Sequence, residues 1–458
     1  MGKNTLSTGR KVSFAIGNIG GIAIGQSSIL LLYVYYLLYL GVPLSPLGIS
    51  AILVIYGIWD ALNEPLIGHI SDSTQSRWGR RKPFIAVGII PLVIFSYLIY
   101  TPPVSSPVVC VIYLIVILLI YETFVTMVIT LWFSLFPELS LEQTERLTIS
   151  KYLQIFGVLG LILGVGVAPL VAGSFQSPLR GYSIMGAILG AIAALSMLPT
   201  LFFVRERKEY QITKEEKLPF FESVIISLRN RSFLYFVLVQ FLLQLSYSLV
   251  LSSLPLFFEG VLGLDAKAWS MQLLLIFITV IPSLFVWVKI GDRRGTKFGL
   301  FLSMALFCAT FPLVFLVNSP GAMQGVLLLG GIGLAGLMLF PTVLLSDVID
   351  EDQLVTHKRR EGLFNGVSGV IVKLSNALSW LLVGIVLTLF RIDRGNLAPA
   401  SLTSENELGL RMLVGFFPVL VILLGLYFLH RYPLAGDRLQ TVKEQVRELN
   451  NRLTRSGE

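Results

Sequence analysis

The sequence GHISDSTQSRWGRRK occupies residues 68–82, directly after the second long apolar stretch of the chain. A shorter version of the same turn, GDRRG, occupies residues 291–295, directly after the eighth apolar stretch. A Gly, an Asp and paired Arg residues therefore return at the same place in each half of the chain. This recurrence predicts two related halves, each built from six apolar segments.

The composition indicates a membrane protein. Of the 458 residues, 55% are hydrophobic and only 14% are charged, and the mean hydropathy is +0.79. A soluble chain carries roughly 25% charged residues. The apolar residues lie in long runs, many of them about 20 residues or more, which is the length of a helix that crosses a bilayer. Because backbone groups in lipid must pair within a helix, we predict an all-α integral membrane protein.

The apolar runs predict about twelve transmembrane helices in two groups of six. The expected spans are 12–40, 46–72, 83–103, 107–136, 151–173, 181–204, 232–258, 268–291, 296–317, 321–346, 362–390 and 407–431. Glycine pairs within spans, such as Gly160 with Gly164 and Gly186 with Gly190, are expected to allow close helix contacts.

The loops divide the chain further. The predicted parts are an N-terminal half at 1–204, a cytoplasmic linker at 205–231, a C-terminal half at 232–431 and a cytoplasmic tail at 432–458. An amphipathic piece of the linker, at 219–230, is expected to lie on the membrane surface. The tail spaces apolar residues three and four apart from Leu439 to Leu453, so we expect an amphipathic helix docked on the membrane or on the cytoplasmic face.

The charge distribution predicts the orientation. The chain carries 35 Lys and Arg against 27 Asp and Glu, a net charge of +8. A basic balance can indicate nucleic-acid binding, but here the basic residues gather in loops on one side of the membrane. The opposite side receives only Arg180, Lys267, Arg391 and Arg394. By the positive-inside rule we expect both termini in the cytoplasm, a plasma (inner) membrane location and no nucleic-acid partner.

Two acids lie inside the second predicted span, in the segment WDALNEP at residues 59–65. Asp60 and Glu64 are one helical turn apart, so they share a face, with Cβ atoms ~5–6 Å apart. Two like charges on one face repel each other, and in lipid they need a positive partner. A partner that is bound and then released is what a cation-coupled transporter requires.

Neutral oxygens accompany the acid pair. Asn63 lies on the same flank, and Glu122 and Thr126 are one turn apart in the fourth predicted span, at a similar depth. Carboxylate, amide and hydroxyl oxygens are hard ligands that suit Na⁺ or Li⁺, whereas soft metals prefer Cys or His. We predict a cation site at Asp60, Asn63, Glu64 and Thr126, with Na⁺ held by the two acids; a proton can use the same acids.

Lys373 is the deep cation of the predicted spans. It can serve as a counter-charge to the acids or as a solute ligand, and the alternative is a side chain that reaches back to the membrane surface. Asn376 follows one turn later and is a further candidate solute residue. The sequence contains no nucleotide-binding loop, His/Cys metal spacing or nucleophile motif, so we expect neither an enzyme nor a cofactor other than the coupling ion.

Four stretches make the chain resemble the glycoside–pentoside–hexuronide:cation symporters, the melibiose-permease group of the major facilitators. They are WDALNEPLIG (59–68) continuing to RWGRRKP (77–83), FPEL (136–139) followed by Glu145 and Arg146, LRNRSF (228–233), and DVIDED (347–352) continuing to Lys373. The resemblance implies the major facilitator fold. It also implies that Asp60, Asn63, Glu64 and Thr126 match the family's sodium site, with Glu64 replacing a usual Asp, and that Lys373 matches a lysine near both the cation and the solute.

The solute side departs from that family pattern. Sugar-transporting relatives carry an acid in the first span, where this chain reads GGIA at 20–23. The family's solute-facing acid in the fourth span aligns with Ile129, and an arginine in the fifth span aligns with Gln154. Trp132 or Phe133 can still stack on a sugar ring, and Glu122 can replace the missing acid. The candidate solute or coupling residues are Lys373, Glu122, Trp132, Gln154 and Asn376.

Charged residues of the cytoplasmic loops are expected to form an inner gate. The candidates are Asp72, Arg77, Arg80, Arg81, Glu138, Arg146, Asp347 and Arg360. Opening and closing of such a gate would accompany the rocking of the two halves about a site near the middle of the membrane.

The leading hypothesis is a secondary active symporter that couples Na⁺ (or H⁺) entry to uptake of an organic solute, first of all a sugar or glycoside, by alternating access. The first alternative is a sodium-coupled lysophospholipid or amphiphile carrier, because the resembling family includes such carriers and an apolar cavity with one lysine suits an amphiphile. The second is a non-coupled facilitator or sensor that retains the fold. We expect a monomer surrounded by membrane lipid.

Overall fold

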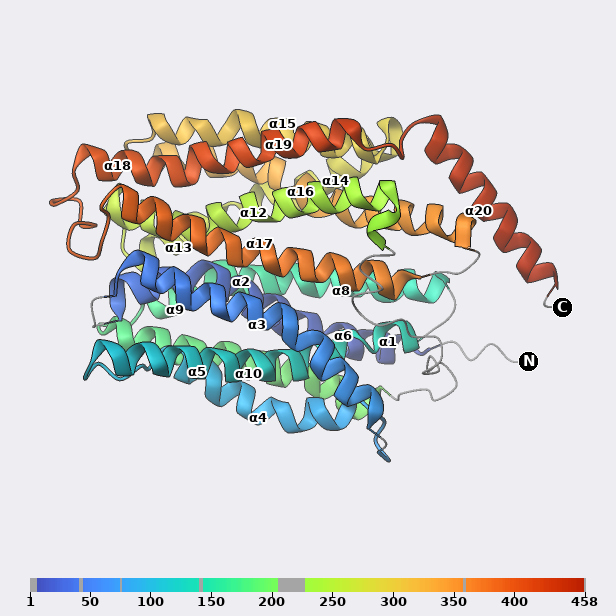
Figure 1. The fold of residues 1–458 in the computed structure, drawn as a ribbon, viewed down its shortest axis with the longest axis horizontal. Helices are drawn as coiled ribbons and strands as arrows, with labels where there is room; N and C mark the ends of the chain where they lie inside the picture. The colour runs from blue at the N-terminus through green and yellow to red at the C-terminus, as the bar shows by residue number, and fades with distance from the viewer. Residues whose placement is uncertain are drawn as a thin grey trace. The chain divides into compact units, whose positions relative to one another are not determined.

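The structure is a computed structural model that describes residues 6–40, 44–74, 76–139, 143–204, 227–356 and 360–456. All regular elements within these ranges are helices (Figure 1). They are α1 (Thr8–Ala15), α2 (Gly17–Val34), η1 (Tyr35–Tyr39), α3 (Pro46–Ser73), α4 (Lys82–Leu98), α5 (Pro107–Val125), η2 (Thr126–Thr130), α6 (Leu131–Phe133), α7 (Phe136–Leu139), α8 (Gln143–Leu161), η3 (Ile162–Val167), α9 (Ala168–Ala172), α10 (Pro178–Phe203), α12 (Arg231–Gly260), α13 (Ala266–Leu275), α14 (Phe277–Arg294), α15 (Thr296–Thr310), η6 (Phe311–Leu316), α16 (Pro320–Thr356), α17 (Glu361–Leu389), α18 (Ser404–Arg411), η7 (Met412–Phe416), α19 (Phe417–Arg431) and α20 (Asp437–Ser456).

The described helices confirm an all-α membrane protein. Eleven helical segments among the described residues are long and apolar enough to cross a bilayer. A shorter apolar helix, α4, stands where the third span is expected. The expected number of about twelve spans is therefore confirmed, because residues of high hydropathy in runs of spanning length form helices in lipid.

Residue contacts divide the chain into two compact units. Unit 1 comprises Met1–Lys217, Leu251–Leu274 and Trp380–Leu410, and unit 2 comprises Leu218–Val250, Leu275–Ser379 and Arg411–Glu458. The helices α12 and α17 each contribute residues to both units. The division of the sequence at 204 and 232 stays a prediction, because these units are defined by contacts and not by chain order.

Small residues bring the helices of unit 1 close together. A Cβ atom added at Gly160 would lie 2.5 Å from the Ile19 carbonyl oxygen on α2, and one added at Gly186 would clash with the Ser96 carbonyl oxygen on α4. Gly164 and Gly190 make similarly close approaches to the same two helices. The expected role of these glycine pairs in helix packing is confirmed, because any larger side chain would push the backbones apart.

Unit 2 packs α16 against α14, α15 and α20. The tail helix α20 confirms the predicted amphipathic helix, and its Val442 and Val446 side chains are buried. It docks on α16, so the protein itself covers its apolar face. Most of the predicted amphipathic piece at 219–230 lies outside the described residues, as do Lys358 and Arg359.

Candidate functional site

The second and fourth membrane segments lie side by side in unit 1. The Trp59 indole on α3 donates through Nε1 to the Leu119 carbonyl oxygen at 3.1 Å and to the Thr123 hydroxyl at 3.2 Å, both on α5. The two helices also pack against each other. Because α3 and α5 are neighbours, the acids of α3 lie near the polar residues that follow α5.

Two hydrogen bonds link the α3 candidates to the fourth segment. The buried Asn63 side chain donates through Nδ2 to the Glu122 carbonyl oxygen at 3.2 Å. The Thr130 hydroxyl donates to Glu64 Oε1 at 3.0 Å. Thr130 was not among the residues expected from the sequence, although its spacing of one turn from Thr126 is a signal that could have found it.

Thr126 lies between these two contacts in sequence. It is fully buried, and its hydroxyl oxygen has no hydrogen-bond partner among the described residues. The Glu122 carbonyl, the usual acceptor for a helical threonine one turn later, already accepts from Asn63 and from the Thr126 backbone N–H. A buried polar atom without a partner costs free energy, so this oxygen is suited to bind a ligand.

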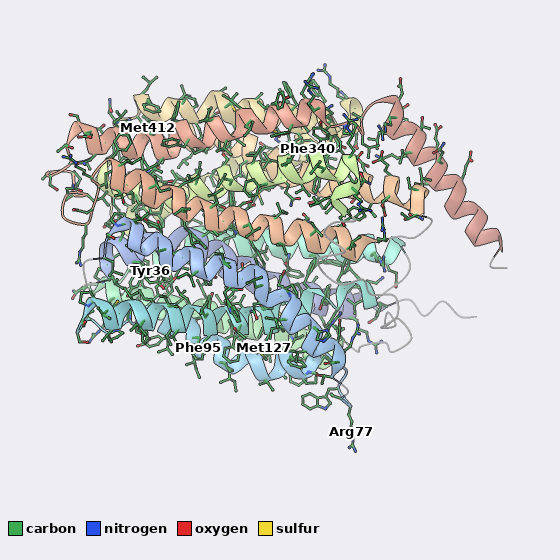
Figure 2. All side chains as sticks on the ribbon, in the orientation of Figure 1. Tyr36, Arg77, Phe95, Met127, Phe340 and Met412 are labelled. Carbon is green, nitrogen blue, oxygen red and sulfur yellow. The ribbon has the colours of Figure 1, made fainter. Side chains whose placement is uncertain are left out.

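The local backbone is unusual at this point. Thr126–Thr130 form η2, a π-helix inserted in the fourth segment, and Figure 2 labels Met127 within it. π-helical turns are rare and occur frequently at functional sites. The wider turn separates Thr126, which is buried, from Thr130, which bonds to Glu64.

The remaining acids are placed in different surroundings. Glu122 is buried, with 3% of its surface exposed, and accepts a hydrogen bond from the Tyr56 hydroxyl on α3. Asp60 is half-buried on the same helix face as Tyr56. Within the described part of the chain, no three Asp, Glu, His or Cys side chains converge as a metal cluster. The predicted donor set of two acids with an amide and a hydroxyl oxygen has the chemistry that suits a monovalent cation or a proton.

Unit 2 holds a cluster of uncharged polar groups on α12 and α17. The Asn376 side-chain oxygen Oδ1 accepts from Gln244 Nε2 at 2.9 Å and from the Ser248 hydroxyl at 2.6 Å. Two turns earlier on α17, the Ser368 hydroxyl donates to Gln240 Oε1 at 2.7 Å. Asn376 was expected from the sequence, but its partners on α12 were not, although amides at a spacing of one turn could have indicated them.

Lys373 lies one turn before Asn376 on α17 and is half-buried. It belongs to unit 2, whereas Asp60 and Glu64 belong to unit 1. Its role as a counter-charge to the acids therefore stays a prediction.

Within the described structure, two candidate solute residues, Trp132 and Gln154, make no contact that indicates a role in ligand binding. Trp132 is 1% exposed, stacks on Phe14 at 4.9 Å, and donates through Nε1 to the Phe14 carbonyl oxygen and the Thr200 hydroxyl. These contacts are those of a packing residue. Gln154 is exposed on α8. A solute contact by either residue stays a prediction.

Three of the gate candidates of unit 1 form ion pairs at one end of the helices. Asp72 Oδ1 lies 3.2 Å from Arg80 Nη1 and 3.5 Å from Arg81 Nη2. Arg81 also donates to the Ser134 carbonyl oxygen. Arg77 is exposed and extends away from the helices in Figure 2. Arg146 is half-buried on α8, and the side chain of Glu138 lies outside the described residues.

In unit 2, the gate candidates bond to residues that the sequence pattern did not indicate. Arg360 holds Asp352 through two hydrogen bonds, Nε to Oδ2 at 2.9 Å and Nη2 to Oδ1 at 2.5 Å. Asp347 pairs with Lys443 of the tail helix at 3.0 Å. Bidentate pairs such as that of Arg360 fix geometry as well as charge.

Comparison with known proteins identifies the family. Residues 13–436 match the family described as MFS/sugar transport protein. An uncharacterized symporter of Synechocystis is 23% identical, and the match covers 97% of each chain. The sodium-dependent lysophosphatidylcholine symporter 1 of Xenopus tropicalis is 24% identical over 98% of this chain and 92% of that protein.

Solved structures agree on the fold. The crystal structure of a mutant of the nucleoside transporter NupG has a TM-score of 0.66 at 14% identity, and the match covers 92% of this chain and 99% of that chain. The D-xylose-proton symporter has a TM-score of 0.61 at 14% identity, with 91% and 96% covered. The expected major facilitator fold is therefore confirmed. The chain belongs to the MFS/sugar transport protein family and is a membrane symporter of the major facilitator superfamily, not an enzyme.

Proposed function

We propose that this symporter couples Na⁺ entry to the uptake of an organic solute, and that Na⁺ binds at Asp60, Asn63, Glu64 and Thr126. The observation that carries the proposal is the buried Thr126 hydroxyl without a hydrogen-bond partner among the described residues, placed between two bonds that join its segment to Asn63 and Glu64. A cation there neutralises the acids of α3. Neutralised acids cost less in a membrane interior, which favours the rocking step of alternating access.

The first candidate solute is a sugar or glycoside. Its support is the cluster of Gln240, Gln244, Ser248, Ser368 and Asn376, whose amides and hydroxyls offer both donors and acceptors to sugar hydroxyls. Lys373, one turn from Asn376, adds a charged donor. The family description as sugar transport points in the same direction.

A lysophospholipid is the second candidate, and a specific observation favours it. Relatives named sodium-dependent lysophosphatidylcholine symporter 1 match nearly the whole chain. A sphingosine-1-phosphate transporter of Xenopus tropicalis is 23% identical over 98% of this chain. For such a solute, Lys373 would hold the phosphate oxygens.

The proposal extends to location and assembly. We infer a plasma (inner) membrane protein with both termini in the cytoplasm, because the basic loops gather on the side of the termini. We also infer a monomer that binds no nucleic acid.

The experiment uses the full chain in proteoliposomes with an inward Na⁺ gradient. Accumulation of a galactoside and of lysophosphatidylcholine is measured in parallel, with an inward proton gradient as a third condition. We expect Na⁺-driven accumulation that Asp60→Asn abolishes, whereas Glu405→Gln, at an exposed acid on α18, leaves it unchanged. Binding of radioactive sodium in detergent gives a readout that needs no solute.

The outcomes separate the hypotheses. Accumulation of lysophosphatidylcholine alone would remove the sugar hypothesis, and accumulation driven only by protons would remove Na⁺ as the coupling ion. Unchanged sodium binding in Asp60→Asn would refute the proposed cation site. A chain that carries solute without any gradient dependence would be the non-coupled facilitator.

A further inference from the structure

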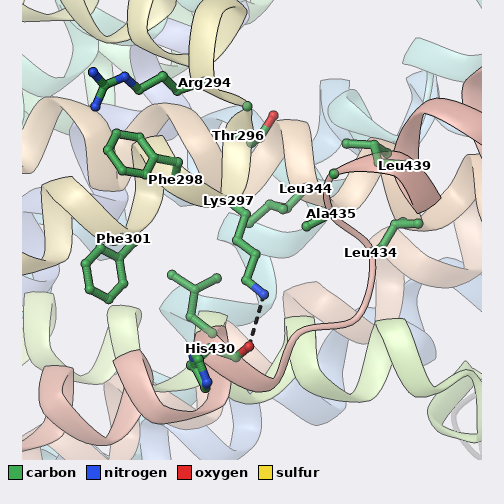
Figure 3. Close-up of a pocket in the computed structure, with 13 residues that line it drawn as sticks. Arg294, Thr296, Lys297, Phe298, Phe301, Leu344, His430, Leu434, Ala435 and Leu439 are labelled. Atoms are coloured by element: carbon green, nitrogen blue, oxygen red, sulfur yellow. Dashed lines mark hydrogen bonds between the residues drawn. The ribbon is translucent and has the colours of Figure 1, made fainter.

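A cavity of about 350 Å³ lies in unit 2, where α15 begins and α19 ends (Figure 3). Its lining comes from α14, α15, α16, α19, the segment that leads into α20, and the first turn of α20. The membrane-spanning segment Thr296–Leu316 begins beside this cavity, and the segment Ser404–Arg431 ends beside it. The cavity therefore lies at the depth of lipid headgroups.

The charged groups of the cavity are all basic. Arg294, Lys297 and His430 line it, and none of its thirteen lining residues is an Asp or a Glu. Lys297 Nζ donates to the backbone carbonyl oxygens of His430 at 3.0 Å and Tyr432 at 2.8 Å. An ammonium group has three N–H donors, so a third remains after these two bonds. The His430 ring is exposed, and an imidazole can donate in either protonation state.

Apolar side chains line two sides of the cavity. Phe298 and Phe301 of α15 lie on one side, and Leu434 and Leu439 lie on the side of the tail (Figure 3). Phe298 and Phe301 are 36% and 44% exposed. In a membrane these exposed rings face acyl chains. The cavity thus places basic side chains, which can bind an anion, next to the apolar rings on α15.

A second hollow of about 380 Å³ adjoins the first and shares Arg294 and Phe298 with it. Lys289 and Arg293 add two further cations to its lining. The Arg294 guanidinium lies 5.1 Å above the Phe298 ring, so this pair forms the ridge between the hollows. Basic residues therefore lie on both sides of the Arg294–Phe298 pair. A surface with both cations and exposed aromatic rings is complementary to a lipid, whose phosphate is anionic and whose acyl chains are apolar.

We propose that this cavity is a binding site for an anionic phospholipid of the surrounding leaflet. The phosphate would bind at Lys297 and His430, and one acyl chain would follow Phe298 and Phe301. The Arg294 guanidinium, which lies over the Phe298 ring, would add a longer-range attraction. Basic pockets between transmembrane helices bind anionic headgroups in this way. The bound lipid would brace α15 against α19 and against the segment that leads into the tail helix, and its ligands are distinct from the cation and solute residues.

The test uses the full chain in mixed micelles with added dioleoyl phosphatidylglycerol, and thermal unfolding and native mass spectrometry as readouts. Arg294→Gln/His430→Gln removes one cation and one hydrogen-bond donor but leaves the Lys297 bonds, because these go to backbone oxygens. Lys151→Gln/Arg229→Gln, at two exposed basic residues elsewhere, is the control with matched substitutions. Loss of the Arg294 charge should weaken phosphatidylglycerol binding about fivefold. Loss of the His430 hydrogen-bond donor should weaken it by about fivefold again, so the double variant should lose roughly 25-fold.

Three measured differences decide the outcome. Phosphatidylglycerol should raise the melting temperature of the native chain and of the control more than dioleoyl phosphatidylcholine does, and the Arg294→Gln/His430→Gln variant should show equal effects of the two lipids. Phe301→Gln should weaken lipid binding without changing the response to inorganic phosphate. Equal phosphatidylglycerol binding in both double variants, or full stabilisation by inorganic phosphate alone, would overturn the proposal.

Discussion

Thr126 and Thr130 show how much a single side chain depends on its local backbone. In a regular helix these two threonines share one face. In the π-helix η2, Thr130 bonds to Glu64, whereas the Thr126 hydroxyl is buried without a partner among the described residues. The same residue type, one turn apart, therefore fills two roles. Thr130 bonds to an acid, and Thr126 is the residue whose oxygen we propose as a cation ligand.

Replacement of Thr126 tests that distinction. Thr126→Val removes a buried oxygen that has no hydrogen bond to lose within the described structure, so the melting temperature without Na⁺ should stay the same or rise. Sodium affinity should fall about tenfold or more, because a hydrogen-bonding group facing a charge contributes roughly 1.5–3 kcal/mol. Thr126→Ser keeps the oxygen and serves as the control. Sodium titrations followed by thermal unfolding measure both effects, and an unchanged sodium response in Thr126→Val would exclude this oxygen as a ligand.

At the scale of helices, the ends of segments carry contacts that hydropathy does not reveal. The Glu259 carboxylate at the end of α12 accepts from the Tyr39 hydroxyl of η1 at 2.7 Å and from Trp269 Nε1 of α13 at 3.1 Å. The consecutive helices α12 and α13 and the distant element η1 thus meet at one acid inside unit 1. Glu259 was not expected to be important from the sequence, because an acid at a span boundary is ordinarily solvated.

Glu259→Gln should weaken this junction. An amide has one acceptor oxygen in place of two, so either the Tyr39 O–H or the Trp269 N–H loses its own acceptor. Leaving a buried donor unsatisfied costs about 1–3 kcal/mol, which should lower the melting temperature by several degrees. Glu405→Gln removes an exposed acid and is the matched control. Identical melting temperatures for the two variants would show that the Glu259 bonds contribute nothing to stability.

For the whole molecule, symport requires that the cation and the solute influence each other's binding. Unit 1 contains the proposed cation residues, and unit 2 contains the polar cluster around Asn376. Coupling between two such sites is a free energy shared by both ligands, and it is therefore reciprocal. Neither unit alone can perform the coupled cycle.

Reciprocity gives a quantitative expectation. Saturating Na⁺ should raise solute affinity by a factor of about 5–150, and saturating solute should raise Na⁺ affinity by the same factor. Isothermal titration of the purified chain, performed in both orders, measures the two factors. In Asp60→Asn both factors should approach unity. Two factors that differ beyond experimental error would contradict a single coupled pair of sites.

Local sequence patterns were enough to predict the class of protein, the approximate spans and the family. They also revealed the two acids inside the second span. These properties depend on hydropathy, helical periodicity and local motifs, each of which is readable within a short stretch of chain. The amphipathic tail was predictable for the same reason, although its contact with α16 was not.

Only the tertiary structure showed which side chains contact each other across helices. Thr130 with Glu64, Gln244 with Asn376, Lys443 with Asp347 and Trp132 with Phe14 are all contacts between helices. Such contacts depend on how each helix is rotated about its axis and how closely it approaches its neighbour. A sequence pattern specifies the face of a helix, but the packing of small and large residues across the interface specifies which neighbour that face contacts.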